Sequence, residues 1–152
     1  MKSLRLLMLT VCLLASCTTL PTPEPTATAV VPYRITPDEN PFAPGLADVN
    51  WQVATVTIVS VGLSEQYEFS PPRAMLSLVG YMPSVCNELR VSINPPDEDF
   101  NLYVDVYSLI NPDVQCDNVF QQFETSILLG TYSPGRYAVW VNDVLMGDFV
   151  SY

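Results

Sequence analysis

The sequence predicts an all-β domain, an antiparallel β-sandwich of seven to eight strands, with a small barrel as the alternative. Short runs rich in β-branched and aromatic residues recur through residues 48–152 of the 152-residue chain. Turn residues separate these runs at intervals of about 8–12 residues. Several runs alternate apolar and polar residues with a period of two, which gives a strand one buried face. No stretch of this region sustains the apolar period of about 3.6 residues typical of a helix.

The composition excludes several classes of function. Sixteen acidic residues against six basic ones give a formal net charge of −10 and a pI near 4.1. A chain this acidic lacks the basic surface that binds phosphate, so we expect no nucleic-acid partner. The chain holds no histidine, which removes the histidine-dependent nucleophilic and metal sites. We therefore expect no enzyme activity, no cofactor and no metal site.

The first residues have the order of a signal peptide. A short basic segment, residues 1–5, precedes an apolar run, residues 6–14, that is too short to cross about 30 Å of hydrocarbon. The run leads into Leu14-Ala15-Ser16-Cys17, which resembles the lipobox of bacterial lipoproteins. The resemblance implies that residues 1–16 are removed and that Cys17 carries a diacylglycerol. The alternatives are an ordinary secretory signal or a short membrane anchor.

Residues 17–47 are expected to be the lipidated cysteine and a disordered linker rich in proline and threonine. Seven of the fourteen prolines lie within residues 18–44, a composition that favours extended polyproline II geometry. At ~3.1 Å per residue such a linker could hold a domain up to about 80 Å from the lipid. After cleavage, four arginines remain against 16 acidic residues, a charge of −12 that anionic headgroups repel. Membrane attachment would then depend on the acyl chains.

The alternating runs predict the bounds of eight strands and the residues of the core. Asn142 and Asp143 lie between the last two runs and are suited to a hairpin turn. The predicted strands are residues 51–61, a short edge strand within 65–69, 74–81, 89–93, 102–107, 123–129, 137–141 and 144–150. The predicted core residues are Leu76, Leu78, Leu89, Val91, Val104, Val106, Ile127, Val139 and Val141.

Two cysteines, Cys86 and Cys116, remain after lipidation of the exported chain. Paired cysteines in exported domains usually form a disulfide. A bridge across their 29 intervening residues would stabilise the fold by roughly 3–4 kcal/mol. A redox dithiol is the alternative, but it would normally need the close spacing that these cysteines lack.

The second half of the domain resembles a group of uncharacterised secreted bacterial domains. The shared features are Gly80-Tyr81-Met82-Pro83 before Cys86, and Leu129-Gly130-Thr131-Tyr132 after Cys116. The stretch that starts at Pro134 also resembles a late hairpin strand of bacterial immunoglobulin-like modules, with Asp143 in place of their glycine. These resemblances imply an immunoglobulin-like sandwich and no known activity. They also place Tyr137 where a tyrosine-corner hydrogen bond is possible.

Acidic residues cluster in two expected loops. Asp97-Glu98-Asp99 are contiguous and lack the loop glycine of a calcium site, so a solvated hairpin tip is favoured over a cation site. Asp113 and Asp117 flank Cys116 and are also suited to turns. No pair among the acidic residues stands out as the two carboxylates of a glycosidase.

Tyr103 and Tyr107 form the candidate binding surface, because they should share the face opposite Leu102, Val104 and Val106. Tyr81, Tyr132 and Trp140 are expected to point outward as well. Tyrosines on an exposed sheet face are suited to binding a protein or a glycan, although they could simply complete the rim of a small core. The favoured function is a non-enzymatic, lipid-anchored binding module on the extracytoplasmic side of the cell membrane. The alternatives are a structural accessory subunit of an envelope complex and an inhibitor of secreted proteases.

Overall fold

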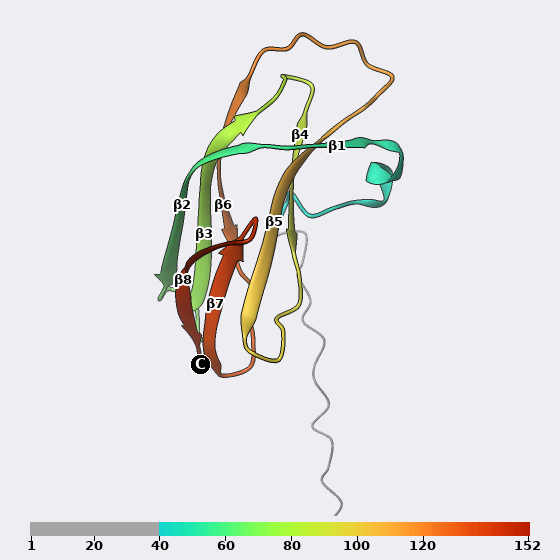
Figure 1. Ribbon diagram of the computed structural model, residues 1–152. Helices are drawn as coiled ribbons and strands as arrows, with labels where there is room; N and C mark the ends of the chain where they lie inside the picture. The colour runs from blue at the N-terminus through green and yellow to red at the C-terminus, as the bar shows by residue number, and fades with distance from the viewer. Residues whose placement is uncertain (1–39) are drawn as a thin grey trace, which may run out of the picture. The chain divides into compact units, whose positions relative to one another are not determined.

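The computed structural model describes residues 40–152, so the predicted signal peptide, Cys17 and most of the linker lie outside the described residues. In this part of the chain eight strands form two sheets (Figure 1). None of its helical segments is long and apolar enough to cross a membrane. The elements in chain order are η1 (Leu46–Asn50), a 3₁₀ helix, and the strands β1 (Gln52–Ala54), β2 (Thr57–Gln66), β3 (Arg73–Met82), β4 (Glu88–Ile93), β5 (Asn101–Ile110), β6 (Gln121–Leu128), β7 (Gly135–Val141) and β8 (Val144–Ser151).

The two sheets confirm the predicted β-sandwich. The five-stranded sheet has the order β1-β5-β7-β8, with β4 also paired to β5, and the three-stranded sheet has the order β2-β3-β6. The pairs are antiparallel except for β5 and β7, which run parallel. This pair corrects the expectation of a purely antiparallel sandwich. Because β1 pairs only with residues 108–110 of β5, residues 101–104 are available to β7.

The hairpin between β7 and β8 turns at Asn142 and Asp143, as predicted. Their φ angles are 46° and 65°, which suits a two-residue type I′ turn, and Val141 pairs with Val144. The Asn142 side chain also accepts a hydrogen bond from Val106 N at 2.7 Å and donates one to Val106 O at 2.9 Å. These two bonds satisfy the backbone of β5 in the interval between its pairing with β7 and its pairing with β1.

The β-branched run at residues 51–61, predicted as one strand, divides between the two sheets. Its first part, β1, pairs with β5, and its second part begins β2, which pairs with β3. The separate edge strand predicted within residues 65–69 is wrong, because β2 continues to Gln66 and a turn follows. A uniform β-branched run favours a strand at every residue, so it carries no signal for a switch between sheets.

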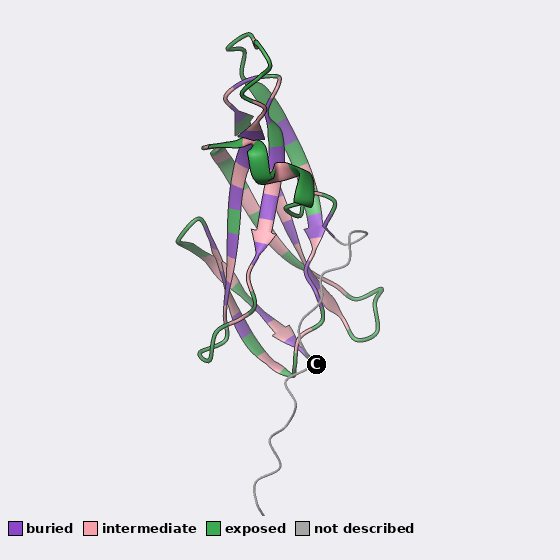
Figure 2. Ribbon diagram, turned by 90° about the vertical axis from the view of Figure 1, so that its right-hand side faces the viewer, coloured by how far each residue is buried: buried purple, intermediate pink, exposed green. Residues whose placement is uncertain are grey.

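The core lies between the sheets and contains all nine residues predicted for it, each at most 6% exposed. Buried and more exposed residues alternate along β3 and β5 (Figure 2). Tyr137 is buried with them, and its hydroxyl donates a hydrogen bond to Ser133 O at 2.9 Å. This bond to backbone a few residues upstream is the predicted tyrosine-corner contact.

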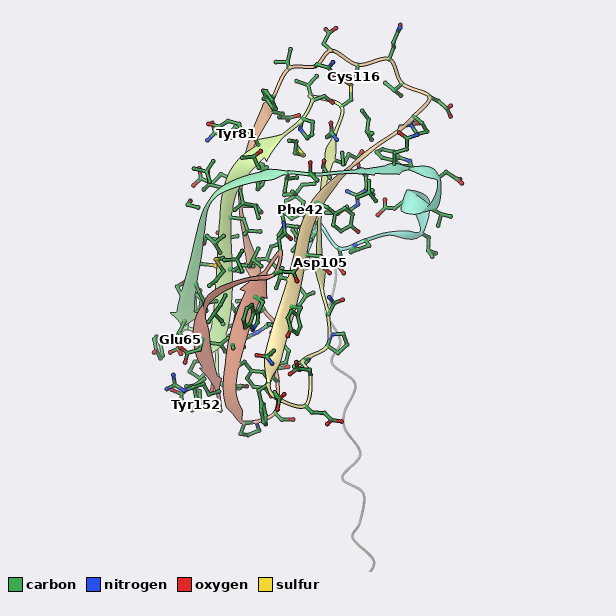
Figure 3. The ribbon with its side chains drawn as sticks, in the orientation of Figure 1. Phe42, Glu65, Tyr81, Asp105, Cys116 and Tyr152 are labelled. Atoms are coloured by element: carbon green, nitrogen blue, oxygen red, sulfur yellow. A yellow bond between two sulfur atoms is a disulfide. The ribbon has the colours of Figure 1, made fainter. Side chains whose placement is uncertain are left out.

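The predicted disulfide between Cys86 and Cys116 is confirmed. Cys86 lies between β3 and β4. Cys116, labelled in Figure 3, lies in the connection from β5 to β6. Their Cα atoms are 6.1 Å apart, within the usual range for a bridge. The bond therefore fastens the long connection between the two sheets to a second loop.

The sandwich begins before residue 48, the predicted boundary. Asn40 is 1% exposed and its side-chain amide donates a hydrogen bond to Val91 O at 2.8 Å. Val91 N donates in turn to Phe42 O at 2.9 Å, and the Phe42 ring packs against the core. Residues 40–42 therefore cover part of the free edge of β4. Because this segment contains Pro41 and is soon followed by Pro44, its composition resembles that of the predicted linker.

Candidate binding surface

The outward-facing side chains of β5 are Tyr103, Asp105 and Tyr107, and Trp140 of β7 lies beside Tyr103 in the sheet register. We call these four residues the aromatic face. The intervening Leu102, Val104 and Val106 are at most 3% exposed and belong to the core. The predicted alternation of β5 is therefore confirmed, and the two candidate tyrosines do share one outer face of the five-stranded sheet.

Tyr103 and Trp140 form one ordered pair. Their ring centroids are 6.1 Å apart with an interplanar angle of 26°. The indole Nε1 of Trp140 donates a hydrogen bond to Asn101 Oδ1 at 3.1 Å. The Asn101 amide in turn donates to both carboxylate oxygens of Asp97, at 3.2 and 3.0 Å. This chain of hydrogen bonds fixes the orientation of the indole while both rings stay partly exposed.

The predicted hairpin tip at residues 97–99 thus contributes to the aromatic face. Asp97 Oδ1 also accepts hydrogen bonds from the backbone of Asp99, at 3.0 Å, and of Asn101, at 2.8 Å. The hydrogen bonds from the Asn101 side chain and backbone lower the pKa of the Asp97 carboxyl. Asp97 therefore acts as a hydrogen-bonded turn residue that supports Trp140 through Asn101.

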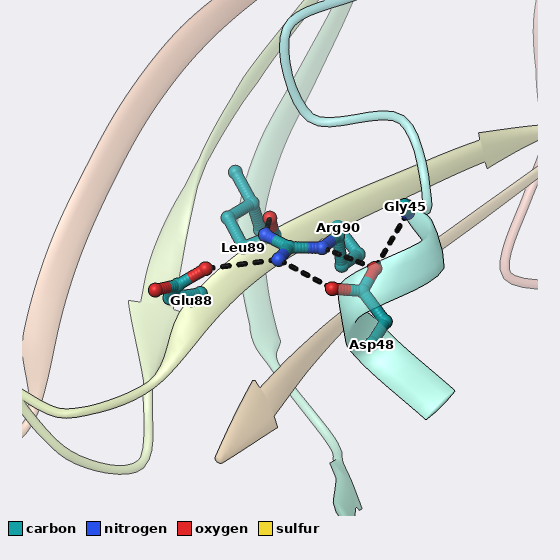
Figure 4. A network of polar contacts seen from close by, with 5 residues as sticks. All are labelled: Gly45, Asp48, Glu88, Leu89 and Arg90. Atoms are coloured by element: carbon teal, nitrogen blue, oxygen red, sulfur yellow. Dashed lines mark hydrogen bonds and ion pairs between the residues drawn. The ribbon is translucent and has the colours of Figure 1, made fainter. Parts of the chain in front are cut away.

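Tyr107 has a different environment from Tyr103. Its register neighbour on β4 is Arg90, whose guanidinium binds both carboxylate oxygens of Asp48 in η1 at 2.8 Å (Figure 4). Arg90 also contacts Glu88 Oε2 at 2.9 Å. Partial burial is the main cause that raises the pKa of Tyr107, and the Asp48 carboxylate adds to it. This end of the aromatic face therefore adjoins an ion pair that holds η1 on the sheet.

Asp48 is strongly stabilised as a carboxylate. The hydrogen bond from Arg90, and a second from Gly45 N at 2.7 Å, lower its pKa to about 2. The same contact with Asp48 raises the pKa of Arg90. The Asp48 side chain is 13% exposed and that of Arg90 is 16% exposed, so solvent screens this pair less than a surface ion pair.

Asp105 lies between the two tyrosines on β5 and is exposed (Figure 3). Its Oδ2 atom accepts a hydrogen bond from Asn94 Nδ2 at 3.0 Å. No described residue donates a hydrogen bond to its Oδ1 atom. Its register neighbour on β4 is Ser92, whose small side chain leaves the carboxylate accessible.

Two other outward predictions have different outcomes. Tyr81 is 39% exposed on the three-stranded sheet, as expected. Tyr132 does not point freely outward, because its ring packs on the rings of Tyr137 and Phe149 at centroid distances of 5.0 and 5.8 Å. It lies in the segment between β6 and β7 and joins a cluster of aromatic rings at the end of the sandwich. A period-two pattern could not indicate this, because Tyr132 lies outside the strands.

The remaining acidic candidates do not converge. Asp113 lies in the β5–β6 connection, where its backbone N donates to Asn111 Oδ1 at 3.0 Å, a local turn contact. Within residues 40–152, no three acidic or cysteine side chains are grouped so that they could hold a metal ion. The Cys17 lipidation site lies outside the described residues and stays a prediction.

Two open grooves follow the sides of the sandwich. One, of about 540 Å³, lies between β4 and β6 and is lined partly by Phe42. The other, of about 370 Å³, lies between β2 and β8 and is lined mainly by aliphatic residues, among them Ile58, Val61 and Met146. Neither groove contains a residue of the aromatic face.

Comparison with known proteins gives a family and no activity. The family model described as the ORF11 beta-sandwich domain matches residues 76–151, which include the whole aromatic face. No curated protein and no solved structure matches the chain.

Proposed function

We propose that the chain, which belongs to the ORF11 beta-sandwich domain family, works by binding rather than by catalysis. The protein would be a lipid-anchored module of the bacterial cell envelope, on the extracytoplasmic side of the membrane. Cys17 would carry the anchor, and the aromatic face would bind a protein or glycan partner. The sequence Leu14-Ala15-Ser16-Cys17 and the proline-rich linker support the anchoring part of this proposal.

The observation that carries the proposal is the fixed, partly exposed pair of Tyr103 and Trp140. Rigid amphipathic rings provide large contact areas and lose little conformational entropy on binding, so they are common anchors of interfaces. The Asn101 contact holds the indole before any partner arrives, which lowers the entropy lost on binding. The pair lies on the side of the sheet away from the core, so packing between the sheets does not require it.

Site-specific photo-crosslinking tests the proposal in the cells that produce the protein. A photoreactive phenylalanine derivative replaces Tyr103 in one variant and Ser126 in a matched control. Ser126 is exposed on β6, on the outer face of the other sheet. We expect discrete crosslinked products from position 103 and none from position 126. No product from position 103, or the same products from both positions, would contradict the proposed binding surface.

The membrane anchor has its own test. We expect the mature protein to start at Cys17 and to carry the mass of a diacylglycerol, as intact-mass analysis would show. Cys17→Ala should block processing or release the protein from the membrane fraction. A chain without acyl groups that starts at another residue would disprove the lipoprotein part and leave the binding surface unaffected.

One observation favours a second candidate function, inhibition of a secreted protease. The β5–β6 connection exposes Val119 and Phe120, at 57% and 72%, and is fastened through Cys116. An exposed apolar loop held by a disulfide can present an extended segment to a protease. An assay of secreted proteases with the wild type and Phe120→Ala would test this. Inhibition that the variant loses supports it, and equal activity with and without the protein excludes it for those proteases.

A further inference from the structure

Asp105 places a negative charge between aromatic side chains. Tyr103 precedes it and Tyr107 follows it at alternate positions of β5, so all three side chains share one face. Trp140 extends the row of rings beside Tyr103. One carboxylate oxygen of Asp105 is held by Asn94, and the other accepts no hydrogen bond from any residue that the structure describes. The face therefore offers a hydrogen-bond acceptor with a full charge next to π-systems.

The cations of the described region are already engaged elsewhere. Arg90 binds Asp48 and Glu88, and Arg136 forms an ion pair with Asp148. Arg73 donates to Leu129 O at 3.1 and 2.7 Å. These are the arginines of residues 40–152, and this region contains no lysine. No arginine of the described region therefore pairs with the charge of Asp105. The strongly acidic chain as a whole attracts a positively charged partner over long range.

Resting on the proposed function, we propose that the aromatic face binds an arginine or lysine side chain presented by a basic protein segment. The guanidinium or ammonium group donates to Asp105 Oδ1 and lies over the ring of Tyr103 or Trp140. A cation within about 6 Å of a ring centroid is attracted by the ring quadrupole. Arginine fits best, because its planar fork can pair with a carboxylate and stack on a ring at the same time.

The acidic residues at the tip before β5 favour a peptide over a neutral glycan. Glu98 and Asp99 are exposed, close in sequence to Asn101, which holds Trp140. Their charges extend the negative potential beyond Asp105. Other basic residues of the same partner segment are therefore also attracted to this surface. A neutral sugar would use the rings but would draw no benefit from these charges.

Calorimetric titration of the full mature chain in non-ionic detergent tests the inference, with hexa-arginine as the probe. Asp105→Asn removes the charge and keeps an acceptor for Asn94. Glu124→Gln is the matched control, because it removes one charge from the exposed outer face of β6. We expect Asp105→Asn to weaken binding about tenfold, the loss of one charge-assisted hydrogen bond, and Glu124→Gln to change it less than about twofold. Tyr103→Leu should also weaken binding of hexa-arginine. This variant takes the place of Asp105→Asn in the test if Asp105→Asn does not fold.

Equal weakening by Asp105→Asn and Glu124→Gln would show general attraction to an acidic protein and overturn the inference. Failure of the wild type to bind hexa-arginine would overturn it as well. So would a neutral oligosaccharide that binds wild type and Asp105→Asn alike. These outcomes leave the crosslinking test of position 103 intact, so failure of the inference is distinguishable from failure of the proposed binding function.

Discussion

The outer face of the five-stranded sheet groups Tyr103, Asp105, Tyr107 and Trp140, whereas that of the three-stranded sheet carries Tyr81 and Glu124 among many short or uncharged side chains. Ser77 of β3 and Ser126 of β6 are register partners there, with hydroxyl oxygens 3.0 Å apart. The inner faces are alike: β3 and β5 both bury every second residue over most of their length. The inner pattern is what holds two sheets together, and both sheets share it. The difference between the outer faces therefore points to a role other than folding.

Polar contacts hold side chains in place on the outer side of the five-stranded sheet. One is the Arg90–Asp48 ion pair. The others are the hydrogen bonds from Trp140 to Asn101 and from Asn101 to Asp97. These contacts fix large side chains in single orientations on an exposed surface, which costs conformational entropy. A surface that only faced water would gain little from that order.

The largest effect is expected from the inner face that both sheets share. Val104→Asp should unfold the domain, because an unpaired buried charge costs several kcal/mol against a total stability of about 5–15 kcal/mol. Ser126→Asp on the outer face of the three-stranded sheet should leave the fold intact. Far-UV circular dichroism and thermal melting of both variants measure this. A folded Val104→Asp variant would contradict the division into inner and outer faces.

Removal of the disulfide should weaken the link between the sheets. Replacing Cys86 and Cys116 together by serine should lower the free energy of unfolding by about 3–4 kcal/mol. Urea denaturation of the wild type and the double variant measures the difference. A reducing agent should destabilise the wild type and leave the variant unchanged. Equal stability of the two proteins would mean that the connection from β5 to β6 is held by other contacts.

Acid should remove the contribution of the Asp48–Arg90 pair to stability. The pKa of Asp48 is lowered to about 2, so its stabilisation is fully present above the unfolded-state pKa and is lost as the pH falls towards 2. Asp48→Asn should therefore be less stable than the wild type at pH 5, by about 1 kcal/mol. The difference should shrink between about pH 4 and pH 2. A constant difference across this range would assign the loss to packing of η1 instead.

A comparably small effect on stability is expected from the aromatic pair. Tyr103→Ala with Trp140→Ala should lower the free energy of unfolding by about 1 kcal/mol, the usual value of an exposed ring pair. Urea denaturation measures it, with Ser77→Ala as the control on the other sheet. A loss of several kcal/mol would make these rings part of the structural framework and weaken the case for a binding surface.

The inner faces could be predicted from the sequence because period-two alternation reports burial directly. It identified nine core residues from Leu76 to Val141, and the Asn142-Asp143 turn followed from residues that tolerate positive φ. The switch from β1 to β2 could not be predicted, since both strands favour the same residue types. The parallel pairing of β7 with β5 depends on long-range partners that local patterns do not encode.

The candidate site was predictable only in part. Alternation placed Tyr103 and Tyr107 on one face, but it could not show that Tyr103 pairs with Trp140 while Tyr107 adjoins Arg90. Both facts require the register of three strands. The role of Asp97 was hidden for the same reason, because its link to Trp140 passes through Asn101. The Cys86–Cys116 bond was easier to predict, since few thiols were available to pair.

The hydrogen bonds between residues 40–42 and β4 determine where a pulling force on the N-terminal side of the chain would enter the sandwich. If the protein is anchored through Cys17, a pull between the membrane and a bound partner enters the sandwich at Asn40, which is bonded to Val91. It leaves at Tyr103 on β5, the strand that β4 pairs with directly. Tension would thus cross one antiparallel ladder and bypass the three-stranded sheet. The linker and the binding surface would then be joined through β4 and β5 alone, by the hydrogen bonds of that one pair of strands.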